Sequence, residues 1–509
     1  MAFNLAYTLA LVCAYFALRR FMRRSTQQGS LMFPGPTPLP IVGNALSLPS
    51  QKVWIKLAEF AKLYGSIYAL RLFGRQIVVL NSPEVARELL EGNSATVYTN
   101  RPLPKIIELA GFDKGVVLEH DLGKLRLARK LLHSVLQPKQ MPLYHEALDY
   151  HINTFLRNLS QDPDDFSQHI HHLTAGINIE VSHGYRVKSR DDSYVGKANV
   201  FGENFARATL HNGHIVNWLP FLAYLPTFLP GMGWKARARA WRDQYISLAQ
   251  EGHEMVKDDI AKGTARPSLT LTALEESEPG LYPDETIMFT ATQVYAGGGD
   301  TTSSILTSFV LLMVQYPETQ KRAQDEIDRA IGPGRLPGLS DRSNLHYVDA
   351  IVTEVARLRP PIPILPRLAA RDEVYNGCLI EDNAYVMMNF WAMLHDEDRY
   401  EDPHAFKPER WLGIEERDAN HHPLEIVFGF GRRVCPGRYL AEETLFAAIA
   451  RVLAVFNISH AEDSKGNPII PSGDTTNGGI TCPVPFTCKI RPRSPAAAEL
   501  VQRSFEDVA

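Results

Sequence analysis

The sequence predicts a mainly α-helical fold with a minor β-sheet, preceded by an N-terminal transmembrane helix. Long runs with helical character, above all 284–316 and 344–359, account for much of the chain. An alternating stretch, 65–80, carries a central glycine and has the pattern of a β-hairpin. The first 18 residues are almost entirely apolar, as in a helix that crosses a membrane.

The composition bounds the class of protein. The chain has 509 residues, 45% of them hydrophobic, which is enough for a sizeable core. A net charge of −4 gives no case for a nucleic acid partner. Five cysteines, few and odd in number, indicate a reducing compartment. Cys482 and Cys488 have no histidine nearby, so we interpret them as structural residues and not as zinc ligands.

The N-terminal apolar run, residues 2–18, has the properties of a membrane anchor. As a helix it is roughly 26 Å long, about the shortest that spans a bilayer. A cleaved signal peptide is the alternative, but its charges precede the apolar core. Here the charges follow it, at Arg19, Arg20, Arg23 and Arg24. Because such charges stay in the cytoplasm, we expect an anchor over 1–24 with the remaining chain on the cytoplasmic side.

The next segment, Phe33–Pro40, is too rich in proline for a helix or a central strand. We predict a stiff hinge over 25–51. No later stretch has the composition of a linker, so 52–493 is expected to be one folded domain. Residues 494–509 are expected to be a flexible tail.

Within the folded domain, Ser82 and Pro83 after the hairpin form the start of a helix, as N-cap and first helical residue. A basic helix follows around 125–132, and its charges could simply face the solvent. The stretch 218–234 is apolar but contains four prolines, which exclude a continuous helix. We expect it to be an exposed patch that contacts a membrane or a substrate, with a buried loop as the alternative.

The long helix 284–316 contains three consecutive glycines, 297–299, followed by Asp300 and Thr301. Each glycine inside a helix costs about 1 kcal/mol against alanine, a cost that close approach by a ligand would explain. A kink or a capping device is an equal alternative. A phosphate-binding loop is disfavoured because no lysine follows.

The helix 344–359 carries Glu354 and Arg357 three residues apart, hence on one face. On its own such a pair is usually a surface salt bridge. Whether this pair is a surface salt bridge or part of a buried cluster therefore depends on the motifs on either side of it.

The stretch 428–437 sets Cys435 in a glycine-rich turn just ahead of an amphipathic helix. Pro436 suits the first helical position, so we expect the helix to begin at the sulfur and its free N–H groups to favour a thiolate. Gly431 and Gly437 can take positive φ and let the backbone curl beneath a flat macrocycle. We predict that Cys435 is a haem-iron ligand; a buried cysteine in a tight turn is the alternative.

Phe428, Gly431, Arg433, Cys435 and Gly437 match, position by position, the FxxGxRxCxG haem-binding loop of the cytochrome P450 family. The chain resembles this family in three further motifs. Residues 296–302 are similar to its oxygen-activation motif, Glu354 and Arg357 to its ExxR pair, and 406–411 to its PERF segment.

The resemblance implies roles for individual residues. Cys435 would be the axial thiolate of haem b, with Phe428 beside the macrocycle. Asp300 and Thr301 would deliver protons during oxygen activation, and Glu354, Arg357 and Arg410 would form a buried cluster behind the haem. Arg129, Arg367 and Arg433 would hold the haem propionates. The family's tryptophan four residues before Arg129 is Leu125 here, which removes one propionate hydrogen bond.

The fold implied is the family's triangular prism, and the activity is an NADPH- and O2-dependent monooxygenase. The chain has no room for a flavin module, so electrons would come from a separate NADPH-cytochrome P450 reductase, with cytochrome b5 as a second donor. Arg126, Arg129 and Lys130, together with the arginines 432, 433 and 438, could form its docking surface. The anchor would sit in the endoplasmic reticulum membrane.

The loop 218–234 resembles the membrane-dipping loop between the family's helices F and G, and its sequence is similar to fungal secondary-metabolism members. The expected substrate is therefore a lipophilic terpenoid, polyketide or aromatic compound. Residues 362–365 would line part of its pocket. Three alternatives stay open: a haem-thiolate isomerase, dehydratase or peroxygenase that needs no reductase, a noncatalytic haem sensor, and a membrane-anchored interaction protein without haem.

Overall fold

The computed structural model describes residues 31–506, apart from 190, 210–213, 218, 277, 415–417 and 419. The predicted membrane anchor over 1–24 lies outside the described residues. Among the helices of the described part, none is both long and apolar enough to cross a membrane.

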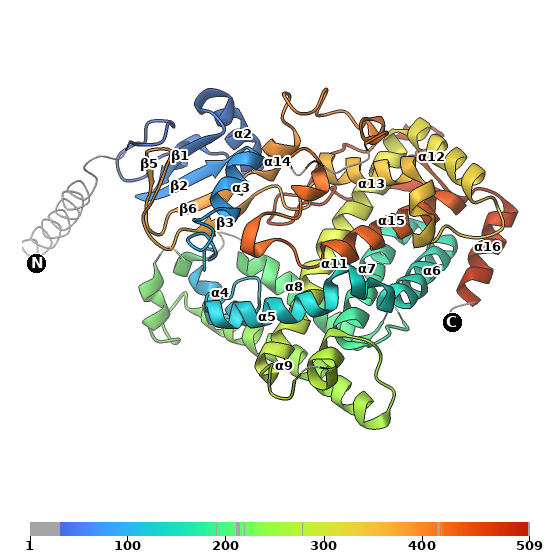
Figure 1. Ribbon diagram of the computed structural model, residues 1–509, viewed down its shortest axis with the longest axis horizontal. Coiled ribbons are helices and arrows are strands. Elements are labelled where there is room, and N and C mark those ends of the chain that lie inside the picture. Colours follow the sequence, from blue (N-terminus) through green and yellow to red (C-terminus); the bar gives the residue numbers. More distant parts are fainter. Residues whose placement is uncertain are drawn as a thin grey trace, which may run out of the picture.

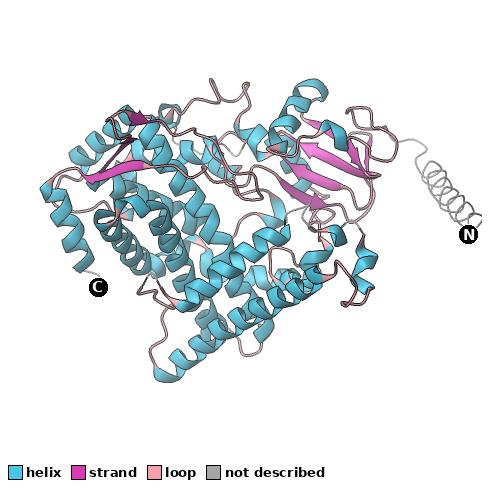
Figure 2. Cartoon of the chain, turned by 180° about the vertical axis from the view of Figure 1, so that it is seen from behind, coloured by secondary structure: helices cyan, strands magenta, loops and turns pink. Residues whose placement is uncertain are grey.

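Helices make up most of the molecule, and the strands gather in groups at its two ends (Figures 1 and 2). The fold class predicted from the sequence is therefore confirmed for the described residues. The helices are α2 (Val53–Tyr64), α3 (Pro83–Glu91), α4 (Lys105–Leu109), α5 (Leu122–Leu136), α6 (His145–Gln161), α7 (Phe166–His183), α8 (Ser193–Thr209), α9 (Gly233–Lys262), α10 (Leu269–Leu271), α11 (Asp284–Gln315), α12 (Pro317–Ala330), α13 (His346–Leu358), α14 (Phe390–Leu394), α15 (Arg438–Val455) and α16 (Pro495–Glu506).

The strands form three small sheets. A four-stranded sheet has the order β1-β2-β6-β3, and its first two strands are the antiparallel hairpin that the sequence predicts. A two-stranded sheet, β4-β5, and a three-stranded sheet, β8-β7-β9, complete the set. The strands are β1 (Ile67–Leu72), β2 (Arg75–Leu80), β3 (Leu365–Leu368), β4 (Glu373–Tyr375), β5 (Cys378–Ile380), β6 (Tyr385–Met388), β7 (Phe456–Glu462), β8 (Pro468–Ile469) and β9 (Cys488–Pro492).

The central element is α11, which packs against α7, α9, α5, α13 and α15. Its second half, from Thr302 to Val314, is buried without interruption. The helix ends at Gln315 because Pro317 begins the next one. The largest hydrophobic core surrounds this half and joins α6, α7, α13 and α15.

The proline-rich segment is part of the folded body, contrary to the predicted hinge. The carbonyl of Pro34 accepts a hydrogen bond from the backbone N–H of Ala69 on β1 at 2.9 Å, and Phe33 is buried. A side chain at Gly35 would overlap the carbonyl oxygen of Ala69. These contacts come from strands more than 30 residues away, which local composition does not reveal.

The C-terminal segment is also ordered, so the predicted flexible tail is wrong for residues 495–506. They form α16, which packs against α6 and α15. Leu500 and Val501 are buried against the main core, and the side-chain amide of Asn153 donates to the carbonyl of Ser504 at 2.8 Å. Buried apolar side chains thus stabilise a helix whose sequence alone gives no sign of its partner.

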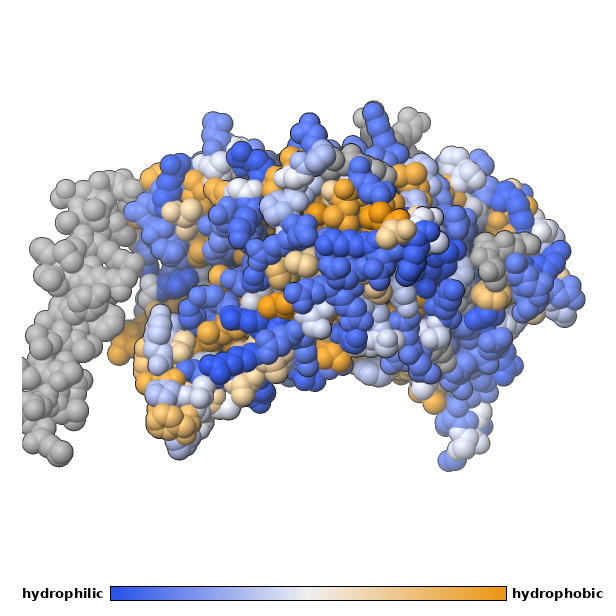
Figure 3. Space-filling view, turned by 90° about the horizontal axis from the view of Figure 1, so that it is seen from below, coloured by the Kyte–Doolittle hydropathy of each residue, from blue (hydrophilic) through white to orange (hydrophobic). Residues whose placement is uncertain are grey.

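The apolar loop between α8 and α9 lies at the surface, as predicted. Leu219, Phe221, Tyr224 and Phe228 are all exposed, Tyr224 and Phe228 at 83% each. The segment projects at the lower left of Figure 1, and Figure 3 shows apolar surface at the same end of the molecule. A buried loop is excluded for these residues.

Candidate haem-thiolate site

Cys435 lies in a tight loop between a short 3-10 turn (Gly431–Arg433) and the start of α15. Its backbone N–H donates to the carbonyl of Phe428 at 2.9 Å, which closes the loop. Helix α15 begins at Arg438, with Gly437 as its N-cap. The helix therefore starts three residues after the sulfur, and the prediction that Pro436 is its first residue is wrong.

The two positions of the loop, 431 and 437, hold glycine for different physical reasons. Gly431 has φ of +66°, and an added Cβ would lie 2.1 Å from the carbonyl oxygen of Leu90 on α3. Gly437 has φ of −88°, so the predicted positive φ is wrong there. An added Cβ at Gly437 would meet no protein atom within 4 Å. That side of the loop therefore has room for a group placed against the backbone.

Burial raises the pKa of the Cys435 thiol above its usual range. The backbone N–H of Gly437 and the charges of Arg129, Arg101 and Arg438 act in the opposite direction and only partly offset this. The N–H at the start of the helix therefore favours the thiolate in the predicted direction, but burial outweighs it in the chain alone. A metal ion itself deprotonates a thiol that coordinates it, so ligation does not require a lowered pKa beforehand.

Four arginines from different parts of the chain converge beside Cys435: Arg101, Arg129, Arg367 and Arg433. Burial and mutual repulsion lower the pKa of Arg101 to about 10 and that of Arg433 to about 9, and they also hold the pKa of Arg367 well below its usual range. Within the described residues none of the four forms an ion pair with a carboxylate. Buried charges of one sign require a counterion, so the cluster calls for an anionic group.

The unused hydrogen-bond donors of this cluster also indicate an anionic ligand. Arg101 Nε and Arg367 Nη1 are buried with no hydrogen-bond partner among the described residues. Arg129 Nη2 donates to the carbonyl of Val434 at 3.1 Å. Arg433 donates from all three of its guanidinium nitrogens, to the backbone carbonyls of Thr99, Val116 and Glu119. Two unused donors in a field of positive charge fit two carboxylates, the number that haem b carries.

Sequence reasoning identified three of these arginines and missed Arg101. It lies outside every helix and outside the motifs, in a stretch where Asn100 bridges to Leu368 beside β3. A single arginine followed by Pro102 carries no pattern that marks it. Only the tertiary structure brings it to the site.

The cluster of Glu354, Arg357 and Arg410 is present as predicted. Glu354 and Arg357 on α13 are fully buried, with the Arg357 Nη2 and Glu354 Oε1 atoms 2.8 Å apart. Arg410 Nε donates to Glu354 Oε1 at 3.1 Å, and the Trp411 indole N–H donates to Oε2 at 2.8 Å.

Arg357 also donates to the backbone. Its Nη1 bonds the carbonyls of Leu394 and Pro403 at 2.8 and 2.7 Å. The cluster therefore ties α13 to the segment 394–411 that precedes the cysteine loop. The alternative of a surface salt bridge is wrong.

The glycine stretch of α11 is accessible, although the helix is mostly buried on both sides of it. Gly297 and Asp300 are exposed, whereas residues 302–314 are buried. A Cβ at Gly298 would lie 2.0 Å from Asn178 Oδ1, so this glycine lets α7 approach closely. Cβ atoms at Gly297 and Gly299 would meet nothing within 4 Å. The two kinds of glycine thus serve helix packing on one side and an open face on the other.

Thr301 donates its hydroxyl to the carbonyl of Gly297 at 2.8 Å, within the same helix. Such a bond bends a helix slightly, and α11 continues through it without a break. The carboxylate of Asp300 lies on the open stretch, near Gly202 of α8. Asp300 and Thr301 therefore offer an acid and an alcohol side by side.

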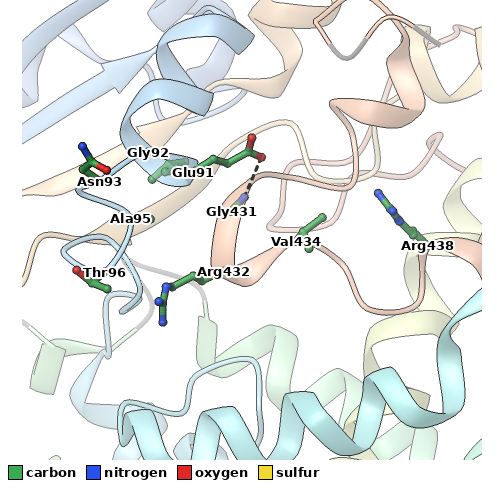
Figure 4. A pocket seen from close by; sticks show the side chains of 10 residues that line it. Glu91, Gly92, Asn93, Ala95, Thr96, Gly431, Arg432, Val434 and Arg438 are labelled. Atoms are coloured by element: carbon green, nitrogen blue, oxygen red, sulfur yellow. Dashed lines mark hydrogen bonds between the residues drawn. The ribbon is translucent and has the colours of Figure 1, made fainter. Parts of the chain in front are cut away.

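A hollow of about 570 Å³ lies between the end of α3 and the outer side of the cysteine loop (Figure 4). Its lining includes Arg432 and Arg438, and the N–H of Gly431 donates to Glu91 Oε1 at 3.2 Å across it. Arg433 is buried. The suggestion from the sequence that it belongs to this outer basic surface is therefore wrong.

The residues present fit haem b. The arginine cluster matches its carboxylates, Gly437 leaves room beside the loop, and Cys435 offers a soft sulfur ligand. Haem b supplies oxidation chemistry when bound, and the chain's own residues bind it, orient the substrate and hold protons.

Comparison with known proteins gives the family. The cytochrome P450 family model matches residues 33–484. Cytochrome P450 monooxygenase 208 of Postia placenta is 35% identical, over 95% of this chain and 94% of its own length. Cytochrome P450 monooxygenase claR of Ampulloclitocybe clavipes is 37% identical, over 93% and 89%. Cytochrome P450 monooxygenase ppsD of Aspergillus oryzae is 34% identical, over 92% and 90%.

Among solved structures, a zebra fish cytochrome P450 with abiraterone superposes with a TM-score of 0.68 and 22% identity. The match covers 87% of this chain and 100% of the other, and it shows the fold. The chain therefore belongs to the cytochrome P450 family and is a monooxygenase whose cofactor is haem b with an axial cysteine thiolate.

Proposed function

We propose that this monooxygenase inserts one oxygen atom from O2 into a lipophilic small molecule of fungal secondary metabolism, a terpenoid, polyketide or aromatic compound. Electrons come from NADPH through a separate reductase, with cytochrome b5 as a second donor. The fungal origin of the relatives named above supports the biological setting. The exposed apolar loop supports a lipophilic substrate.

Cys435 supplies the axial thiolate in this proposal. The observation that carries it is the position of Cys435 beside Arg101 and Arg129, which belong to a cluster with the buried Arg367 and Arg433; within the described residues none of the four has a carboxylate partner. Arg101, Arg129 and Arg367 hold the two propionates through charge-assisted hydrogen bonds. Arg433 adds its positive charge to this cluster while its guanidinium bonds backbone carbonyls.

Asp300 and Thr301 hold and move protons at the open face of α11. The exposed Asp300 carboxylate takes a proton from the solvent, and the neighbouring Thr301 hydroxyl would pass it on. Thr301 must first leave the carbonyl of Gly297, which costs the free energy of one hydrogen bond, about 1 kcal/mol.

The substrate lies against 362–365 at the start of β3. Thr481 joins this stretch to α11, because its N–H donates to the carbonyl of Pro361 at 2.8 Å and its own carbonyl accepts from the Ser304 hydroxyl. This connection holds the substrate wall and the central helix in a fixed relation, as regioselective oxidation requires.

The reductase docks on the outer side of the cysteine loop. Arg126 and Lys130 of α5 and Arg432 of the loop are exposed, and Arg438 is half-buried beside the hollow. A basic surface attracts an acidic partner and raises its association rate.

The anchor and the loop 219–232 contact the same membrane. The localisation we propose is the endoplasmic reticulum membrane, single-pass, with the catalytic domain in the cytosol. The exposed side chains of Phe221, Tyr224 and Phe228 support a lipid contact for the loop.

The test is turnover in a reconstituted system with NADPH, reductase and a panel of terpenoid, polyketide and aromatic substrates under ¹⁸O2. The expected result is one ¹⁸O atom per product. The double variant Arg126→Glu, Lys130→Glu should bind the reductase more weakly than the wild type, and added salt should weaken binding of the wild type in the same way. Product that forms with hydrogen peroxide alone and never with the reductase would overturn the monooxygenase cycle in favour of a peroxygenase.

A further inference from the structure

We propose that His171 on α7 supplies protons from the solvent to Asp300 through the hydroxyl of Ser303. The inference rests on the proposed function of Asp300 and Thr301 and extends their relay to the protein surface. It concerns a residue that delivers protons to Asp300 in addition to the solvent water that reaches this exposed carboxylate.

The contact between the two helices carries the proposal. His171 Nδ1 and Ser303 Oγ are 3.2 Å apart. Ser303 lies three residues after Asp300 on α11, so the two side chains share one face of that helix. The imidazole is half-buried, whereas Ser303 is fully buried. His171 therefore connects the buried hydroxyl beside Asp300 with the solvent.

The approach of α7 to α11 at this point is fixed by the packing. Gly298 has no Cβ, which leaves space for Asn178 of α7. Asn178 is held in turn by a hydrogen bond from its amide to the carbonyl of Thr174 at 2.7 Å. On the other side, α8 brings Gly202 near the carboxylate of Asp300 and adds no side chain there.

Within the described part of the chain, three titratable groups interact with the charge of Asp300: Tyr295, Cys482 and His171. The charge of Asp300 raises the pKa values of Tyr295 and Cys482, which burial already raises, so both stay protonated at neutral pH. Burial lowers the pKa of His171, and Asp300, which faces it from α11, opposes that shift. His172, its neighbour on α7, points elsewhere and contacts the carbonyl of Ser189.

The proton step is balanced without any other reactant. The imidazolium gives its Nδ1 proton to the oxygen of Ser303, and the hydroxyl proton of Ser303 passes to the carboxylate of Asp300. His171 becomes neutral and Asp300 becomes a carboxylic acid. A proton from solvent water then restores the imidazolium.

The first test measures the histidine directly. In protein with ¹³C-labelled histidine, the signal of His171 is assigned by its loss in His171→Asn and titrated by NMR in the wild type and in Asp300→Asn. Because the negative charge of Asp300 favours the imidazolium, the pKa of His171 should fall in Asp300→Asn. An unchanged pKa would overturn the proposal, since the two groups would not be coupled.

The second test uses three variants in the reconstituted enzyme: His171→Asn, His171→Phe and, as a control, His172→Asn. Asparagine keeps a hydrogen bond to Ser303 but cannot titrate. Both His171 variants should lower the fraction of NADPH electrons that reach product by about fivefold and raise the solvent isotope effect. Water still reaches the exposed Asp300, so the loss stays below the full contribution of a general acid.

The pH profile separates proton supply from structure. Product formation in the wild type should rise as the pH falls toward the lowered pKa of His171, and both His171 variants should lose this rise. A His171→Asn enzyme with wild-type coupling and pH profile would show that the contact is structural. Wild-type protein without turnover in the reductase assay would count against the proposed function and leave the NMR result to decide this inference.

Discussion

At the scale of single residues, the site depends on a few positions where the neighbouring atoms permit only one type of side chain. Gly431 is one, because both its φ of +66° and the carbonyl of Leu90 exclude a side chain. Glu354 is another, since it is fully buried and joins two arginines. Sequence motifs identify both residues. The reason for Gly431, contact with α3, is visible only in the structure.

Gly431→Ala should destabilise the folded protein by about 2 kcal/mol or more, from the left-handed backbone and the overlap with Leu90. Gly437→Ala is the matched control, because an added Cβ meets no protein atom within 4 Å. It should keep the unfolding temperature of the haem-free protein but lower the haem content of the purified protein. Thermal unfolding and haem absorbance measure the two effects. Equal unfolding temperatures for both variants would contradict this view of the loop.

Glu354→Gln should destabilise the protein by about 3–5 kcal/mol, because it leaves the buried charges of Arg357 and Arg410 without their carboxylate. Glu59→Gln, which breaks an exposed pair with Lys56, should cost at most about 1 kcal/mol. Urea unfolding followed by fluorescence compares them. Similar midpoints would mean that the cluster does not hold the segment before the cysteine loop.

At the scale of elements, the sequence predicts what local periodicity encodes. The long helix α11 and the hairpin β1-β2 were predicted close to their observed bounds. The docking of Phe33–Pro40 on β1 and the helix α16 were not, because both depend on contacts distant in sequence. Arg101 was missed for the same reason. Local patterns do not show which far segment completes a surface.

Helix packing requires glycine at one position of α11 but not at the next one. Gly298→Ala should lower stability by about 1–3 kcal/mol, since its Cβ would overlap Asn178 and push α7 away. Gly299→Ala has open space around it and should raise stability by up to about 1 kcal/mol through helix propensity. Urea unfolding of both variants is the measurement. A stabilising Gly298→Ala would show that α7 and α11 are not in close contact there.

At the scale of the whole molecule, buried neutral histidines limit stability in acid. Burial lowers the pKa of His183 to about 3, and that of His395 to about 3 as well. Between pH 6.5 and 3 the unfolded chain binds a proton at each of these sites and the folded protein does not. Stability should therefore fall as the pH falls through this window.

His183→Asn tests the contribution of one site. Between pH 6 and 4 the free energy of unfolding of the wild type should decrease more steeply than that of the variant, by about 1.4 kcal/mol per pH unit. Urea titrations at several pH values give the two slopes. Parallel slopes would mean that His183 is protonated in the folded protein.

The central claim for the whole molecule is that Cys435, beside the arginine cluster, is the axial haem ligand. The most direct measurement is the carbon monoxide difference spectrum of the reduced protein, for the wild type, Cys435→Ala and the control Cys378→Ala, a half-buried cysteine on β5. We predict a strongly red-shifted Soret band in the wild type and in Cys378→Ala, and its loss in Cys435→Ala. A red-shifted band that persists in Cys435→Ala would contradict the assignment of the thiolate to this residue.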